Sequence, residues 1–369
     1  MNPAAFRESV TAWLAGHADE LEPFRARPFT VLAEHVERLR PFHRRLYDAG
    51  FTRAGWPADS GGSGGSALLR GVLYDEILAA GYDLPRGFEF AEIIVPTLFD
   101  FAPHLARRHL PAILRGDLLM CQGFSEPGSG SDLGSLTTRA VPDRDGFRVT
   151  GQKTWIGNGA VADWCLLLAR TGDRASRHRG LTMLWIDMTS PGLSTRPIAM
   201  ADGTDELAEL YLDDVAVPAE HVVGGVGQGW AVAMHLLQFE RSTWAWQRQA
   251  HLLATLSTAA REGARPAALG TAFLDALALR ALSLEALLTT AAGHPLGPAS
   301  SVTKLVLSTA ERSALDARLS AGDPILTDPA GHHAAEWFHA RSTSVFGGAA
   351  EIQRDLVADR VLGLPRGSA

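Results

Sequence analysis

The stretch Q-G-F-S-E-P-G-S-G-S-D-L-G-S, residues 122–135, is the most informative part of this chain. Gly128 and Gly130, together with small hydroxyl residues, offer backbone N–H groups with little steric shielding, and such a turn can hold a phosphate or the edge of an aromatic cofactor. Glycine and serine also dominate ordinary surface turns, so the loop alone does not decide the matter. The neighbouring stretch G-Q-K-T-W-I-G-N, residues 151–158, follows a β-rich run and places Trp155 where an indole could cover a flat ring. Together the two stretches predict a cofactor site.

Three segments with different residue patterns make up the chain. Residues 1–118 carry apolar residues at three- and four-residue spacings, which is typical of amphipathic helices. Residues 119–226 hold short β-rich runs separated by Gly, Pro and Asp, and they predict an antiparallel barrel or sandwich with a hairpin turn at D-R-D-G, residues 143–146. Residues 227–369 return to helical spacing and predict a four-helix bundle that begins with one long helix over 229–256. We therefore expect a mixed α and β fold of three domains.

Composition excludes several classes of protein. A length of 369 residues, 46% of them hydrophobic and 20% charged, is typical of a soluble globular protein with two or three packed units. The net charge of −7 predicts no nucleic-acid partner. No apolar run reaches the ~18 residues that span a bilayer and no signal peptide is visible, so we expect a cytoplasmic protein without membrane contact. The two cysteines, Cys121 and Cys165, exclude a disulfide framework, and we expect no metal site.

Three motifs in fixed order make the chain resemble the acyl-CoA dehydrogenase family. They are S-E-P-G-S-G-S-D at 125–132, G-Q-K-T-W-I at 151–156 and E-I-Q-R-D-L-V-A-D-R-V-L-G-L-P-R at 351–366, and the similarity extends over essentially the whole chain. The resemblance implies an α-helical N-terminal domain, a central β-domain and a C-terminal helical bundle. It further implies FAD as cofactor, an acyl-CoA thioester as substrate and an electron-transfer flavoprotein as electron acceptor.

Transferred residue by residue, the resemblance also implies a set of site residues. Those expected at the cofactor are Gln122, Phe124, Ser125, Gly130, Ser131, Trp155, Gly157 and Gly348. Ser131 would meet the pyrophosphate or the pantetheine arm of the thioester, and Trp155 would stack near the isoalloxazine. Gly157 stands where the family usually has Ser or Thr, so a hydroxyl that would reach the flavin N5 is missing. Ser131, Gln238 and Arg241 are the expected substrate contacts.

The catalytic carboxylate is absent from the place where many members of the family carry it. Their reaction needs a carboxylate in a desolvated pocket that removes an α-proton while hydride leaves the β-carbon for the flavin. In many members a Glu precedes the G-T of the C-terminal motif. In S-V-F-G-G-A-A-E-I-Q-R, residues 344–354, Gly347 occupies the position of that Glu and Ala349 the position of the Thr. Glu351 is the nearest carboxylate and is the lesser candidate for the base.

A second position for the base exists in the family, on a helix of the C-terminal bundle. The matching stretch here is L-L-Q-F-E-R-S-T-W, residues 236–244, with Glu240 followed by Arg241. The resemblance therefore implies Glu240 as the catalytic base. Arg241 would then steady the carboxylate or the CoA moiety.

One further departure from the family bears on partners. The stretch that usually reads R-x-x-F-G and contacts FAD across a subunit interface is replaced by R-E-G-A-R-P-A-A-L-G, residues 261–270. The chain would form either a homo-oligomer or a heterotetramer with a second acyl-CoA dehydrogenase-like chain. Three functions stay open: a dehydrogenase that uses Glu240, a flavoenzyme with altered chemistry (an oxidase, or one acting on a carrier-protein-linked acyl group), and a non-catalytic partner subunit.

Overall fold

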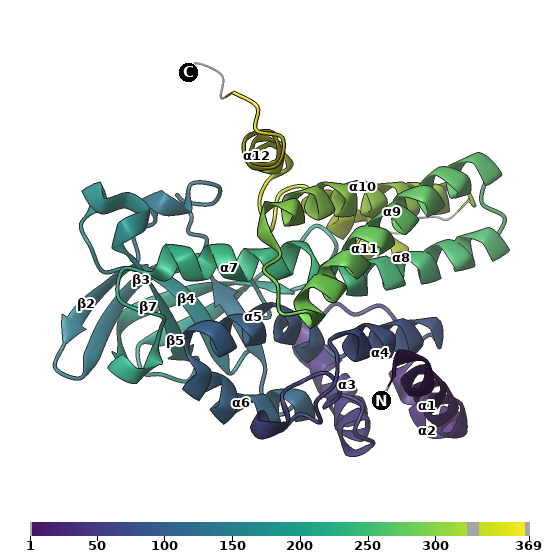
Figure 1. Cartoon of the computed structure of the whole chain (residues 1–369), viewed down its shortest axis with the longest axis horizontal. Coiled ribbons are helices and arrows are strands. Elements are labelled where there is room, and N and C mark those ends of the chain that lie inside the picture. Colours follow the sequence, from purple (N-terminus) through teal and green to yellow (C-terminus); the bar gives the residue numbers. More distant parts are fainter. Residues whose placement is uncertain (1, 323–331, 366–369) are drawn as a thin grey trace.

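The computed structural model describes residues 2–322 and 332–365, which form a helical N-terminal part, a β-sheet and a C-terminal helical bundle (Figure 1). The N-terminal helices are α1 (Pro3–Gly16), α2 (Ala18–Leu21), α3 (Leu32–Asp48), α4 (Leu68–Ala79), α5 (Gly87–Phe101) and α6 (Pro103–Arg115). The Gly- and Ser-rich stretch 56–66 is irregular apart from a short 3₁₀ turn, as its composition predicts. Most side chains of α5 are buried, because this helix contacts α6, α7 and α8 and so lies between the sheet and the bundle.

The strands form one mixed sheet. They are β1 (Met120–Gly123), β2 (Arg139–Asp143), β3 (Gly146–Gly157), β4 (Trp164–Arg170), β5 (Leu181–Asp187), β6 (Leu193–Ile198), β7 (Leu207–Pro218) and β8 (Val222–Val223). Their order is β6-β7-β3-β2-β4-β5-β8, with β1 paired to β4. The predicted β2–β3 hairpin is confirmed by the pairing of Asp143 with Gly146. The expectation of purely antiparallel strands is wrong, since β1 runs parallel to β4.

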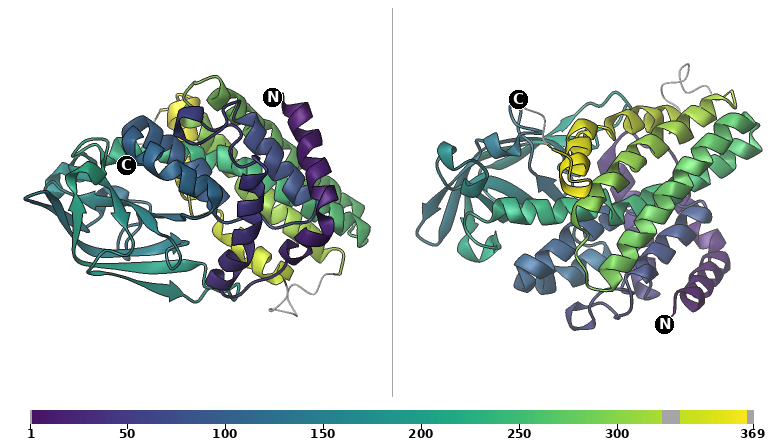
Figure 2. Two further views of the ribbon diagram at one scale, coloured as in Figure 1. Left: turned by 90° about the horizontal axis from the view of Figure 1, so that it is seen from below. Right: turned by 45° about the horizontal axis from the view of Figure 1, so that its top comes forward.

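Strands β4 and β5 are buried on both faces, which explains their continuous apolar sequences. On one face Leu166, Leu168 and Trp185 join the core shared with α5, α6 and α7. On the other face Leu167 and Leu184 join the core between these strands and β3 and β7. The sheet thus curls on itself, so that β4 and β5 lie between the helices on one side and β3 and β7 on the other (Figure 2).

The C-terminal helices are α7 (Gly229–Arg241), α8 (Thr243–Arg261), α9 (Pro266–Ala291), α10 (Ser300–Leu319), α11 (His332–Ser342) and α12 (Ala350–Leu356). The prediction of one helix over 229–256 is wrong, because the chain leaves helical geometry at Ser242, with φ −134° and ψ −67°. The break lets α7 lie along the sheet while α8 turns into the bundle with α9 and α10 (Figure 1). The 3.6-residue pattern continues through the break, so the sequence does not reveal it.

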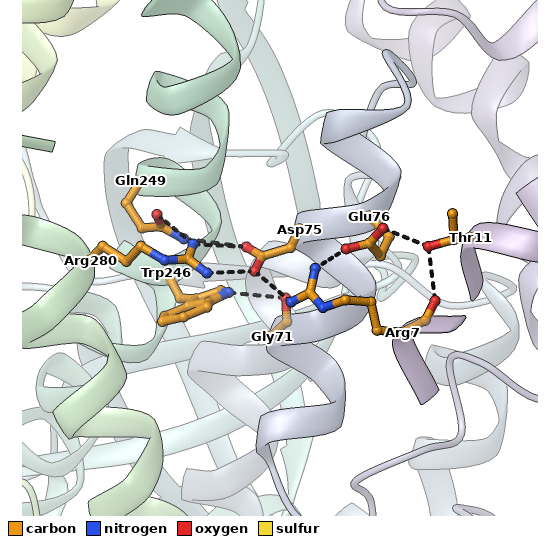
Figure 3. A network of polar contacts seen from close by, with 8 residues as sticks. All are labelled: Arg7, Thr11, Gly71, Asp75, Glu76, Trp246, Gln249 and Arg280. Atoms are coloured by element: carbon orange, nitrogen blue, oxygen red, sulfur yellow. Dashed lines mark hydrogen bonds and ion pairs between the residues drawn. The ribbon is translucent and has the colours of Figure 1, made fainter. Parts of the chain in front are cut away.

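A buried polar network joins the N-terminal helices to the bundle. Asp75 of α4 accepts hydrogen bonds from Arg280 of α9 at 2.9 Å, from Arg7 of α1 at 3.3 Å and from Gln249 of α8 at 3.4 Å (Figure 3). Beside it, the Trp246 indole donates to the Gly71 carbonyl at 3.0 Å. These contacts fix α4 against α8 and α9.

Helix α9 is unusually apolar for its exposure. Of the described helices it alone is long and apolar enough to cross a membrane by length and composition, and 22% of its most apolar window is buried. Its exposed apolar side chains recur at helical spacing along one stripe: Phe273, Leu274, Leu277, Leu284 and Leu288.

Candidate functional site

Glu240 lies in the last turn of α7, at the junction of the sheet, α5 and the bundle. Its side chain is buried, although a carboxylate is rarely buried without partners. The Gln122 amide of β1 donates a hydrogen bond to Glu240 Oε2 at 2.9 Å. The break at Ser242 leaves Glu240 at a helix end rather than in the middle of the expected long helix. Residues that are far apart in the sequence therefore meet at the edge of the predicted flavin loop.

Gly347 adjoins this carboxylate. A Cβ atom added at Gly347 would lie 2.7 Å from Glu240 Oε1, closer than real Cβ atoms approach. Gly347 also has φ +65°, a conformation that side chains rarely adopt. Arg241 Nε donates to the Gly347 carbonyl at 2.9 Å, which holds the loop in place. The structure thus places the Glu240 carboxylate at the position that Gly347 leaves empty.

Gly348 is equally constrained, but by a different side chain. It has φ +107°, and an added Cβ would lie 2.2 Å from Gln353 Nε2 and 3.1 Å from an Arg241 nitrogen. Gln353 of α12 is fully buried, and neither polar atom of its amide has a partner in the described part of the chain. Gln353 and Arg241 therefore exclude a side chain at Gly348. Its contact with a flavin stays a prediction.

Lys304 of α10 is a member of this site that the sequence did not reveal. Its side chain is 2% exposed, and its Nζ lies 3.4 Å from the same hypothetical Gly347 Cβ and 4.2 Å from the centre of the Phe346 ring. Burial lowers the pKa of Lys304 to about 8, while the Glu240 and Glu311 carboxylates oppose that shift. The available signal was its spacing with Ser301, Ser308 and Glu311, which lie on the buried face of α10.

A buried ion pair builds the base of the 122–135 loop. The Glu126 carboxylate accepts from Lys153 Nζ at 2.9 Å and from the backbone N–H groups of Thr137 and Thr138 at 2.7 and 2.8 Å. Lys153 also donates to the Phe124 carbonyl at 3.0 Å. Burial disfavours the ionised carboxyl, but Lys153 and these donors overcome it and hold the pKa of Glu126 at about 2. Glu126 of the first motif and Lys153 of the second thus join the two motifs through a buried ion pair.

The remaining predicted cofactor residues lie on β1, on the 122–135 loop and at the end of β3. Phe124 is buried and Ser125 half-buried, whereas Gly130 and Ser131 are exposed on the open part of the loop. Trp155 has φ +61° and is 59% exposed, so its indole stands out from the surface. An added Cβ at Gly157 would meet Phe90 at 3.4 Å, an ordinary contact, so the space would admit a small side chain.

The expected substrate residues of α7 are engaged with the protein itself. Gln238 accepts a hydrogen bond from the Gly297 N–H at 2.9 Å, which anchors the turn before α10. Arg241 is used at Gly347, as described above. The alternative base, Glu351, is 79% exposed and pairs only loosely with Arg354 at 3.7 Å. Of the two candidate carboxylates, Glu240 is therefore the one that the structure brings to Gln122 and Gly347.

Comparison with known proteins gives a consistent result along the chain. The family description "Acyl-CoA dehydrogenase, middle domain" matches residues 121–215, and "Acyl-CoA dehydrogenase, C-terminal domain" matches residues 227–362. The chain is 36% identical to acyl-CoA dehydrogenase IpdE1 of Mycobacterium tuberculosis, covering 98% of this chain and 97% of that protein. It is 33% identical to the IpdE1 of Mycolicibacterium smegmatis, covering 88% of each. Among solved structures, the steroid ACAD Tcur3481-Tcur3483 superposes with a TM-score of 0.82 at 27% identity, over 100% of this chain and 99% of that one.

Proposed function

This chain belongs to the acyl-CoA dehydrogenase family of flavin-dependent oxidoreductases, and we propose that it oxidises an acyl-CoA thioester with FAD as cofactor and Glu240 as the base. The observation that supports this proposal is the buried Glu240 carboxylate, whose Oε1 lies 2.7 Å from a hypothetical Cβ at Gly347, the residue that aligns with the Glu of many members of the family. Gln122 holds one carboxylate oxygen, and the other faces Gly347.

The residues present fit a flavin. Gln122 Oε1 is buried and has no partner in the described part of the chain, so it offers an acceptor to a bound group. Trp155 presents an uncovered indole, and an added Cβ at Gly130 would have nothing within 4 Å, so the loop is open for a pyrophosphate. Bound FAD supplies the hydride acceptor that no side chain can provide.

Glu240 would act by removing the α-proton of the thioester. A base must reach that proton in a fixed orientation, and α7 supplies a rigid support because it packs on β5 and α5. The hydrogen bond from Gln122 fixes the orientation of the carboxylate. Burial of the site excludes water, which would otherwise compete for the ionised oxygens.

An oligomer, either of this chain alone or with a second chain of the same family, would complete the site. The exposed apolar stripe of α9 offers the surface for such a contact, since contiguous apolar surface of this kind marks protein interfaces. We further propose a cytoplasmic location and an electron-transfer flavoprotein as acceptor. The acyl group would be of the steroid-derived kind, because the similar Tcur3481-Tcur3483 protein is a steroid ACAD.

Flavin bleaching tests the proposal. The purified chain should show a flavin spectrum that bleaches anaerobically with at least one member of an acyl-CoA panel, including CoA thioesters of steroid fragments. Glu240→Gln should keep the flavin and lose the bleaching by at least about 100-fold, as expected for loss of a general base. The matched control Glu351→Gln, at an exposed carboxylate on α12, should bleach at the normal rate. Bleaching that survives Glu240→Gln would refute the assignment of the base.

A second chemistry is favoured by one observation, the absence of a hydroxyl at Gly157 although the space beside Phe90 admits one. The chain would then act as an oxidase or on a carrier-protein-linked acyl group, and not as an acyl-CoA dehydrogenase. Reoxidation of the bleached flavin by dissolved oxygen at a catalytic rate identifies the first, and bleaching by an acylated carrier protein but not by acyl-CoA identifies the second.

A further inference from the structure

Lys304 is a buried cation without a hydrogen-bond partner in the described part of the chain. Its Nζ is inaccessible to solvent and lies 4.2 Å from the centre of the Phe346 ring. Burial of an unpaired ammonium lowers the stability of a protein, and a methionine or leucine would fill the same space at lower cost. A charge at this position therefore calls for a function.

The nearest functional group is the proposed base. Glu240 Oε1 and Lys304 Nζ lie 2.7 and 3.4 Å from one point, the hypothetical Cβ of Gly347, so the two atoms are at most about 6 Å apart. No hydrogen bond joins them. The ammonium thus acts on the carboxylate through space, which leaves Glu240 Oε1 free to take a proton.

The other ionisable groups around this pair are engaged elsewhere. On α8 and α10, Arg248 and Glu311 pair with each other at 2.5 Å. On α7, Arg241 donates to the Gly347 carbonyl. On α5, Glu89 adds a second acid near Glu240, and burial raises the pKa of Glu89 to about 7. From β1 the neutral Gln122 faces Glu240. The charge of Arg241 also acts on Glu240, but among the described residues around Glu240, Lys304 is the cation that has no hydrogen-bond partner.

We propose that Lys304 is a positioning residue for the base, whose buried ammonium acts on the Glu240 carboxylate through space and directs its free oxygen to the space above Gly347. This inference rests on the proposed role of Glu240. An opposite charge within about 4–6 Å favours an ionised carboxylate by one to three pH units. Since the pKa of Lys304 is about 8, the effect fades above that pH.

The test compares Lys304→Met with Lys304→Arg. In Lys304→Met, the acid limb of the pH profile of flavin reduction should move to higher pH by about one to three units. At pH values below the limb its rate should therefore fall by about tenfold for each unit of displacement, and at high pH it should approach the wild-type rate. Lys304→Arg, which keeps the charge, should restore the limb at least in part. The melting temperature of Lys304→Met should stay the same or rise, because the variant buries a thioether instead of an ammonium.

Ser308→Ala is the matched control for packing. Ser308 lies one turn further along the same buried face and donates to the Thr343 carbonyl at 2.9 Å, but carries no charge. It should lower the melting temperature and leave the acid limb in place. A loss of rate in Lys304→Met that is equal at every pH, or a fall in its melting temperature with an unmoved limb, overturns the proposal.

Infrared spectroscopy separates this proposal from the proposed function. Infrared spectra of wild type and of Glu240→Gln are recorded without substrate at a series of pH values. The difference spectrum reports the protonation of Glu240 whether or not the enzyme turns over. In the Lys304→Met background the carboxylic acid band should persist to higher pH. An unmoved band overturns the role of Lys304 even if Glu240 is the base. If the band moves in Lys304→Met but flavin bleaching survives Glu240→Gln, the electrostatic role of Lys304 is supported and only the assignment of Glu240 as the base is refuted.

Discussion

Replacing Gly347 with alanine is expected to disable the Glu240 carboxylate while leaving the flavin loop intact. The new Cβ would lie 2.7 Å from Glu240 Oε1, and an ordinary contact needs about 3.4 Å, so the carboxylate must move by about 0.7 Å. That movement strains or breaks the hydrogen bond from Gln122, worth about 1 kcal/mol. Alanine at φ +65° adds about 1–2 kcal/mol of backbone strain.

The two effects have separate readouts. A displacement approaching 1 Å costs up to about 100-fold in rate, so stopped-flow flavin reduction by the best acyl-CoA should slow by about 10- to 100-fold. Urea unfolding should show a loss of about 1–3 kcal/mol from strain and the lost hydrogen bond together. Gly293→Ala is the control, because Gly293 has φ +74° but no atom within 4 Å of an added Cβ. The reasoning fails if Gly347→Ala reduces its flavin at the wild-type rate, or if Gly293→Ala slows reduction equally.

Three further outcomes follow from contacts away from Gly347. The pKa of Glu126, about 2, lies below its ordinary value, so its ionised form stabilises the fold above pH about 4.5 by at most about 3 kcal/mol, and this contribution is lost as the pH falls through 2. Glu126→Gln should thus be less stable to urea than wild type at pH 6, and the difference in the free energy of unfolding should disappear on acidification. Asp75→Asn should lower the free energy of unfolding in urea by about 2–4 kcal/mol, because it leaves Arg280 without its ion-pair partner. Glu76→Gln loses only the ion pair to the half-exposed Arg7 and should cost less than about 1 kcal/mol in the same titration. Leu274→Glu should reduce the oligomer measured by light scattering, and an unchanged mass would exclude the α9 stripe as the interface.

Much of the fold could be predicted because each segment has its own residue period. The change from helical to strand spacing after residue 118 and back after residue 226 reflects which side chains face a core, and the family resemblance supplied the arrangement. The parallel pairing of β1 with β4 could not be predicted, since a strand's own residues do not encode its neighbour. The break at Ser242 was missed because its neighbours on both sides are apolar at helical spacing, and burial at the junction decides the conformation.

The site was predictable where a motif fixed the alignment and not where packing alone decides. Alignment of the C-terminal motif pointed from Gly347 to Glu240, and the structure brings these two residues together. Lys304 is a single lysine on a long helix, and such residues usually face solvent, so its spacing with other residues of the buried face is a weaker signal than the three-dimensional packing of α10, which shows that it is buried. Similarly, the amide of Gln353 becomes notable only once its lack of a partner in the described part of the chain is seen.

Different side chains exclude a larger residue at Gly347 and at Gly348, and this difference is relevant to whether the chain is a catalytic subunit. A subunit that had merely lost its base would leave an empty position at Gly347, which larger residues could fill. Here Glu240 excludes a side chain at Gly347, and Gln353 and Arg241 exclude one at Gly348. A buried carboxylate held by Gln122, next to a buried ammonium, lowers stability and has no evident structural benefit. Such a cost is expected where the carboxylate serves proton abstraction, and it argues against a non-catalytic subunit.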